Sequence, residues 1–119
     1  MMMSHRLRAV RSAVALSAVV SRPEARRPEG RRQDAFTSIV NLSGTGALLS
    51  TDRTYTEGDV VHLRFSLPGM AEVQTEARVA RVVGEGQVGV TFERLEDRTT
   101  EMIVRHVVLE ERRRLARAV

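Results

Sequence analysis

Apolar and polar residues alternate with a period of two through the middle of the chain, a pattern typical of half-buried β-strands. In residues 60–67 the apolar side chains take the odd positions from 61 onward. In residues 72–83 we expect Val73, Thr75, Ala77 and Val79 to point into the core. In the last segment of this kind we expect the same of residues 88, 90 and 92. Val- and Ala-rich or apolar runs at 11–20, 35–42 and 47–50 extend the β pattern toward the N-terminus. Short strands separated by frequent turns predict a small, all-β antiparallel barrel.

The period changes near Asp97, where a stretch free of Gly and Pro begins. Ile103 and Val107 are four residues apart, as are Val104 and Val108, which predicts a helix over about 97–117 that packs on the barrel. Its last part, residues 110–117, is mostly charged, so we expect it to project into solvent or to meet a partner.

Residues 1–20 admit two interpretations. Three arginines followed by a nine-residue apolar run imitate a secretory signal peptide, but Ser12 and Ser17 interrupt that run and no clear cleavage site follows. The alternative is a first β-strand at 11–20, preceded by an arm of residues 1–10. We adopt the second interpretation, with one domain over 11–119 and a cytoplasmic location. No segment is long enough to span a bilayer.

All 19 basic residues are Arg, and their distribution is uneven. Residues 1–33 carry a net charge of +6 and residues 34–119 a net charge of −2. The polar segment 21–34 holds five of these arginines and two prolines, which predicts an exposed loop. A nucleic-acid-binding arm is the alternative, but no aromatic residue is interleaved for base stacking, so we expect no nucleic acid partner.

The sequence lacks the residues or spacings that several kinds of catalytic and metal sites require. There is no Cys, and His5, His62 and His106 show no metal-ligand spacing. We expect His62 and His106 to be surface residues, on the polar face of a strand and on the helix. Since no nucleotide-binding loop or nucleophile motif occurs either, we expect neither an enzyme nor a metal or other cofactor.

The stretch Asn41-Leu42-Ser43-Gly44-Thr45-Gly46 separates two apolar β-like runs. Its Asn and Ser side chains are short enough to hydrogen-bond locally or to reach a ligand. Its two glycines permit positive φ angles and a close approach by another group, so the pattern alone indicates a sharply bent, tightly packed hairpin.

The motif Asn41-x-Ser43-x-x-Gly46 resembles the D/N-x-S-x-x-G motif of PilZ domains, bacterial receptors for cyclic di-GMP. The similarity runs over about residues 8–110 and includes Gly58-Asp59-Val60, Leu67-Pro68-Gly69 and Val88-Gly89-Val90-x-Phe92. The resemblance implies a six-stranded antiparallel barrel with a C-terminal helix. It also implies a site for cyclic di-GMP in which Asn41 and Ser43 bind a guanine and Gly46 lets the ligand approach the backbone.

Members of the family usually carry a second motif, R-x-x-x-R, on the arm before the first strand. Arg11 matches its second arginine, whereas the first falls at Leu7, between Arg6 and Arg8. The resemblance therefore implies that Arg6 or Arg8 would join Arg11 in clamping an intercalated, tetra-anionic ligand dimer.

Arg27 and Arg31 also satisfy R-x-x-x-R, but they lie too close to Asn41 for a strand to fit between the two motifs. We interpret that match as a coincidence.

Three hypotheses follow. The first is a cyclic di-GMP receptor or adaptor that acts on an unidentified protein partner of a motility, secretion or polysaccharide system. The second is a PilZ-like adaptor that binds protein without the nucleotide. The third is an Arg-rich nucleic-acid-binding protein that uses residues 22–32.

Overall fold

The computed structural model describes residues 10–22 and 34–117 of the 119-residue chain. Strands and helix follow one another in the predicted order, six strands and then one helix. The elements are β1 (Ser12–Ser21), β2 (Asp34–Leu42), β3 (Gly46–Ser50), β4 (Val60–Ser66), β5 (Glu72–Val82), β6 (Gln87–Glu93) and α2 (Asp97–Arg117).

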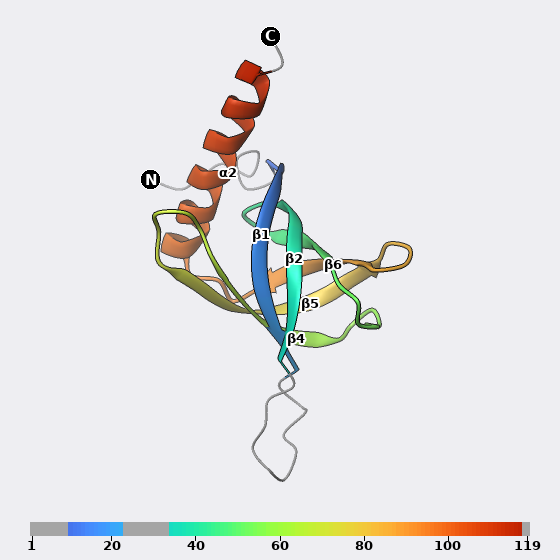
Figure 1. Ribbon diagram of the computed structural model, residues 1–119. Coiled ribbons are helices and arrows are strands. Elements are labelled where there is room, and N and C mark those ends of the chain that lie inside the picture. Colours follow the sequence, from blue (N-terminus) through green and yellow to red (C-terminus); the bar gives the residue numbers. More distant parts are fainter. Residues whose placement is uncertain (1–9, 23–33, 118–119) are drawn as a thin grey trace.

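The six strands close into one antiparallel barrel with the order β1-β2-β3-β6-β5-β4 (Figure 1). Every strand has two hydrogen-bonded neighbours, so no sheet edge is left to pair with another chain. The ring closes where residues 18–21 of β1 pair with residues 62–65 of β4. The predicted fold class, a six-stranded antiparallel barrel with a C-terminal helix, is confirmed.

The barrel interior is filled by the residues that the period-two pattern assigned to it. On β5 the positions 73, 75, 77 and 79 are buried and the residues between them are exposed. Aliphatic side chains dominate the core, and two of its aromatic rings, those of Phe65 and Phe92, stack with centroids 6.2 Å apart.

Helix α2 packs one face against the barrel, and its main contacts are with β1. Ile103, Val104 and Val107 are almost fully buried, as the spacing of four residues predicted. The last turns rise beyond the barrel (Figure 1), and residues 112–117 are exposed. No helix within the described segments is long and apolar enough to cross a membrane.

The prediction that both histidines are surface residues is wrong for His106, which is only 8% exposed. It lies on the same buried face of α2 as Ile103 and Val107, so helical packing buries it although imidazole is polar. His62 is half-buried on β4, and its Nδ1 atom is buried without a hydrogen-bond partner in the described part of the chain.

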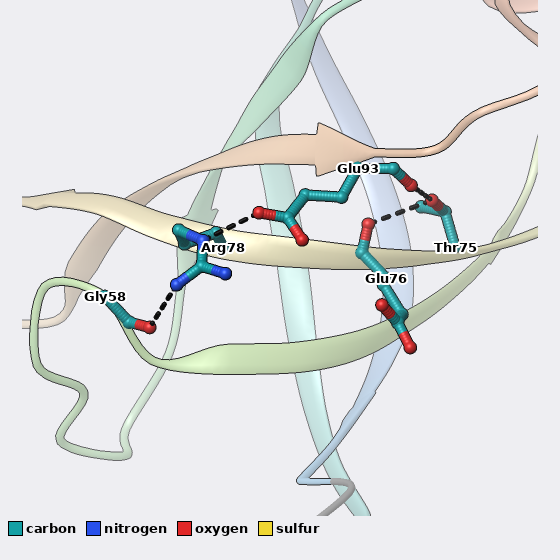
Figure 2. A network of polar contacts seen from close by, with 5 residues as sticks. All are labelled: Gly58, Thr75, Glu76, Arg78 and Glu93. Carbon is teal, nitrogen blue, oxygen red and sulfur yellow. Dashed lines mark hydrogen bonds and ion pairs between the residues drawn. The ribbon is translucent and has the colours of Figure 1, made fainter.

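Polar contacts tie β5 and β6 to the segment before β4 (Figure 2). The Arg78 guanidinium donates from Nε to the Glu93 carboxylate at 2.7 Å and from Nη1 to the Gly58 carbonyl at 3.1 Å. Three residues earlier on β5, the Thr75 hydroxyl lies within hydrogen-bonding distance of the Glu76 and Glu93 carbonyl oxygens. These bonds link β5 to β6 and to the segment before β4.

The only tyrosine of the chain, Tyr55, is buried beneath an arginine. The Arg22 guanidinium carbon lies 5.0 Å from the centroid of the Tyr55 ring, and the same guanidinium donates to the Thr54 carbonyl at 2.8 Å. Burial raises the pKa of the Tyr55 hydroxyl, and the positive charges of Arg22 and Arg53 partly offset this effect. The contact holds the loop after β3 against the end of β1.

Candidate functional site

A pocket of about 180 Å³ opens on the outside of the barrel where β1 begins and the β2–β3 turn lies. Its walls come from the start of β1, the β2–β3 turn, β5 and β6. Four of the six predicted ligand-binding residues line it, namely Arg11, Asn41, Ser43 and Gly46, together with Arg81, Gly89 and six further residues.

Arg11 reaches the pocket because of the pairing between β1 and β2. Ser12 is the Cα partner of Leu42, so Arg11, one residue earlier, extends beside the β2–β3 turn. Its side chain is exposed and forms part of the pocket wall. Arg6 and Arg8, the other predicted arm residues, lie outside the described residues, as do Arg27 and Arg31.

Asn41 faces the pocket because the pairing of β2 with β3 is irregular. Ile39 pairs with Leu49 but Asn41 pairs with Leu48, so Val40 is an extra residue on β2. A strict alternation from the buried Ile39 would turn the Asn41 side chain into the core. The bulge reverses the side on which the strand presents it, a common use of bulges next to binding sites.

Ser43 builds the turn between β2 and β3. Its hydroxyl oxygen accepts hydrogen bonds from the backbone N–H groups of Thr45 and Gly46, both at 3.2 Å, and lies 3.1 Å from the Thr45 hydroxyl. Its own N–H donates to the Gly46 carbonyl at 2.9 Å. Because Ser43 is only 4% exposed and its hydroxyl is already engaged, it positions its neighbours at the pocket rim.

Gly46 is required by the approach of β6. A Cβ atom at this position would lie 2.2 Å from the Val90 carbonyl oxygen, far inside van der Waals contact. The predicted close approach is therefore to a neighbouring strand. The predicted positive φ is absent, since the described glycines with positive φ are Gly58, Gly69, Gly84 and Gly86.

Arg81 is a site residue that the sequence analysis missed. Val79 pairs with Val90 and Arg81 with Gly89, so Ala80 is an extra residue that moves Arg81 from the core side of β5 to the pocket side. A Cβ on Gly89 would lie 3.1 Å from both Cγ and Nε of Arg81. The Arg81 side chain therefore lies over Gly89, which has no side chain of its own. The sequence offers one signal. Alternation from the buried residues Val73 to Val79 would place Arg81 inside the core, where an arginine is not expected.

The second half of α2 lies beside the start of β1. Glu111 pairs with Arg114, which lowers the pKa of the Glu111 carboxyl, and the hydroxyl of Ser12 adds a smaller lowering. Ser12 follows Arg11 directly, and its side chain is almost fully buried. Arg11 is therefore held next to Ser12, a residue that also contacts α2.

The pocket suits a planar, anionic ligand. Arg11 and Arg81 supply two guanidinium groups, which present forked donors to phosphate or to the edge of a purine. Asn41 supplies an amide that donates and accepts, and no carboxylate is present among the described lining residues. Within the described residues, no cluster of three or more His, Cys, Asp or Glu side chains has the geometry to hold a metal ion.

The chain was compared with known protein families and structures. A model of the PilZ domain matches residues 5–109, which is most of the chain. No curated protein sequence matches it.

Several solved structures share the fold at low sequence identity. The Bacillus subtilis inhibitor of motility (MotI/DgrA) matches with a TM-score of 0.71 and 17% identity over 98% of this chain and 53% of its own. The PilZ domain of CeSA from a cellulose-synthesizing bacterium matches with a TM-score of 0.61 and 18% sequence identity, over 85% of this chain and 97% of its own. MrkH of K. pneumonia matches with a TM-score of 0.61 and 15% sequence identity, over 96% of this chain and 53% of its own.

At these identities the structural matches establish the fold alone, and the chain spans about half the length of MotI/DgrA and of MrkH. The match of the family model covers both the β2–β3 motif and Arg11, which directly precedes β1. The chain belongs to the PilZ domain family.

Proposed function

We propose that this protein is a cytoplasmic cyclic di-GMP receptor or adaptor that couples the level of the second messenger to a protein partner. The observation that carries the proposal is the pocket that brings Arg11, Arg81 and Asn41 together with the β2–β3 turn. Membership of the family supports the ligand class.

The charge of the pocket fits the ligand. Cyclic di-GMP carries two phosphates, and an intercalated pair of molecules carries four negative charges. Arg11 and Arg81 offer two permanent positive charges, and no lining carboxylate opposes them. Arg81 adds a cation from the barrel itself, which offsets the irregular spacing of the arginines on the arm.

The polar groups of the β2–β3 turn fit a guanine. Asn41 has one acceptor oxygen and two donor hydrogens, which match the mixed donor and acceptor edge of the base. Ser43 acts mainly through the turn that holds Asn41 and Thr45 at the rim, because its hydroxyl oxygen already accepts two backbone hydrogen bonds.

The size of the pocket gives the arm a role. A volume of about 180 Å³ is smaller than the roughly 300–1,000 Å³ of sites that enclose a drug-sized ligand. The ligand would therefore lie on the pocket, and residues 1–10 would cover it from the other side with Arg6 or Arg8. Contact between these residues and the bound ligand would change the surface presented to a partner, which would couple ligand binding to partner binding.

The structural relatives suggest the kind of partner. One is an inhibitor of motility, and another is the PilZ domain of a protein from a cellulose-synthesizing bacterium. A motility or polysaccharide system is accordingly the class in which to search, with secretion systems as a further class.

Isothermal titration with cyclic di-GMP tests the proposal. We expect the wild-type protein to bind, and Arg11→Ala, Arg81→Ala and Asn41→Ala each to weaken affinity by about 10- to 100-fold, because each removes hydrogen bonds to a charged or polar ligand. Arg105→Ala is the matched control, since this exposed arginine lies on α2 away from the pocket lining.

Arg6→Ala and Arg8→Ala identify the arm residue, since only one of them is expected to weaken binding strongly. No heat of binding at ligand concentrations of tens of micromolar contradicts the proposal and leaves an adaptor that binds protein without the nucleotide. Salt-dependent binding to DNA that is lost when the arginines of residues 22–32 are replaced would instead favour the nucleic-acid hypothesis.

A further inference from the structure

Phe36 is an exposed aromatic side chain in the middle of a strand. It is 84% exposed, more than any other large apolar side chain among the described residues. It lies on the outer side of β2, next to Val19 of β1. Aromatic rings exposed on a rigid sheet are typical anchors of protein interfaces, because they bury a large area and lose little conformational freedom.

Two shallow hollows flank this ring. Each has a volume of about 420 Å³, and Phe36 and Ser17 line both. The hollow on the β1–β4 side also includes Val19, Arg64 and Glu72. A projecting ring and a hollow that can receive a ring therefore lie next to each other on one face.

The hollow on the β1–β4 side carries charges of both signs. Val19 has Arg64 as its Cα partner on β4, and Ser66, two residues further on, has Glu72 as its partner on β5. The hollow thus contains one cation and one anion. Asp52 lines the other hollow, so the described residues of the two hollows include one cation and two anions. A face of a single sign would call for a partner of opposite charge, whereas a face with a knob, a hollow and both signs can pair with a second copy of itself.

Self-complementarity of this kind defines a two-fold interface, in which the same patch is used by both subunits. We propose that the outer face of β2, β1 and β4 packs against a second copy of this chain. Phe36 of each copy enters the hollow beside Val19 of the other, and Arg64 of one copy faces Glu72 of the other. Serines around the ring, Ser17 and Ser38 among them, form the polar rim.

The face leaves the candidate ligand site free. Phe36 and Asn41 are five residues apart on β2, a separation of about 17 Å along an extended strand. Dimer formation through Phe36 therefore needs no ligand, and its test does not depend on the proposed function.

Sedimentation equilibrium of the full-length chain over about 5–500 µM tests the proposal, a range suited to a small interface. We expect a monomer–dimer equilibrium whose association constant falls at least tenfold in Phe36→Ser. Leu115→Ser is the matched control, since Leu115 is another exposed apolar residue (56% exposed) on the far end of α2. It is expected to leave the equilibrium unchanged.

A charge exchange gives a second, independent measurement. Arg64→Glu and Glu72→Arg are each expected to weaken the dimer, and the double variant Arg64→Glu/Glu72→Arg to restore it to within about threefold of wild type, because the pair acts across the two-fold axis. A protein that stays monomeric at 500 µM overturns the proposal. So does a dimer that Phe36→Ser leaves intact, or a double variant that is as weak as the two single variants.

Discussion

Replacing Gly46 with alanine tests the structural role of the motif glycine. The new Cβ would lie 2.2 Å from the Val90 carbonyl oxygen, so β3 and β6 must separate locally by about 1 Å to reach ordinary contact. The Phe92 N–H donates to the Thr45 carbonyl at 2.9 Å beside this point, and a separation of that size breaks the bond.

The expected loss of stability can be worked out from these two effects. Overpacking against a backbone that cannot yield costs about 1–3 kcal/mol, and the lost hydrogen bond about 1–2 kcal/mol. The smaller conformational entropy of alanine in the unfolded chain returns about 0.4–1 kcal/mol. We therefore expect the free energy of unfolding to fall by about 1–5 kcal/mol, which corresponds to a drop in Tm of about 4–20 °C for a domain of this length.

Differential scanning calorimetry without ligand measures this effect. Gly89→Ala is the matched control, because its Cβ meets only the exposed Arg81 side chain, which can move away. Its Tm is expected to change by less than about 3 °C. If Gly46→Ala melts within that same margin of wild type, β6 is not held against Gly46 and the assignment of a structural role is wrong.

Three further predictions concern the site and the buried tyrosine. Ser43→Ala removes the acceptor of two backbone N–H groups and should lower the free energy of unfolding by about 1–3 kcal/mol, measured by urea denaturation; unchanged stability would assign Ser43 to the ligand alone. Gly89→Ala, although stable, should weaken cyclic di-GMP binding in titration calorimetry because it displaces Arg81, and wild-type affinity would show that Arg81 does not contact the ligand. Burial raises the pKa of Tyr55, so the folded state keeps the phenolic proton while the unfolded chain loses it. Stability should consequently fall as pH rises above about 10, by at most about 1.4 kcal/mol per pH unit. Tyr55→Phe should abolish this fall, and since the chain has no Lys, no Cys and no second Tyr, a fall that persists in the variant would contradict the assignment.

Much of the fold could be predicted from the sequence because burial acts on alternate residues. The inward positions of β4 and β5 are correct through Val79, and the helix begins at Asp97 as expected. Alternation depends only on the pleat of each strand, which local sequence determines. His106 shows the limit of this reasoning, since its burial depends on how α2 rests on the barrel.

The candidate site was only partly predictable because bulges decide which residues face it. Asn41 was identified through its motif, while alternation from Ile39 would have placed its side chain in the core. Arg81 had no motif, and alternation from Val79 points the wrong way, so it was missed. An extra residue in one strand depends on its pairing with the neighbouring strand, which a single strand's sequence does not encode.

The closed ring also has a consequence for the order of folding. The pairs β1–β2, β2–β3, β4–β5 and β5–β6 join neighbours in sequence, whereas β1–β4 and β3–β6 join residues about 40 positions apart. Closing these two seams requires the largest loss of chain entropy, so we expect them to form late. Gly46 pairs with Thr91 in the β3–β6 seam, and both residues line the pocket. A ligand bound in this pocket would thus stabilise contacts of a late-forming seam, and it would act by slowing unfolding while leaving the folding rate nearly unchanged.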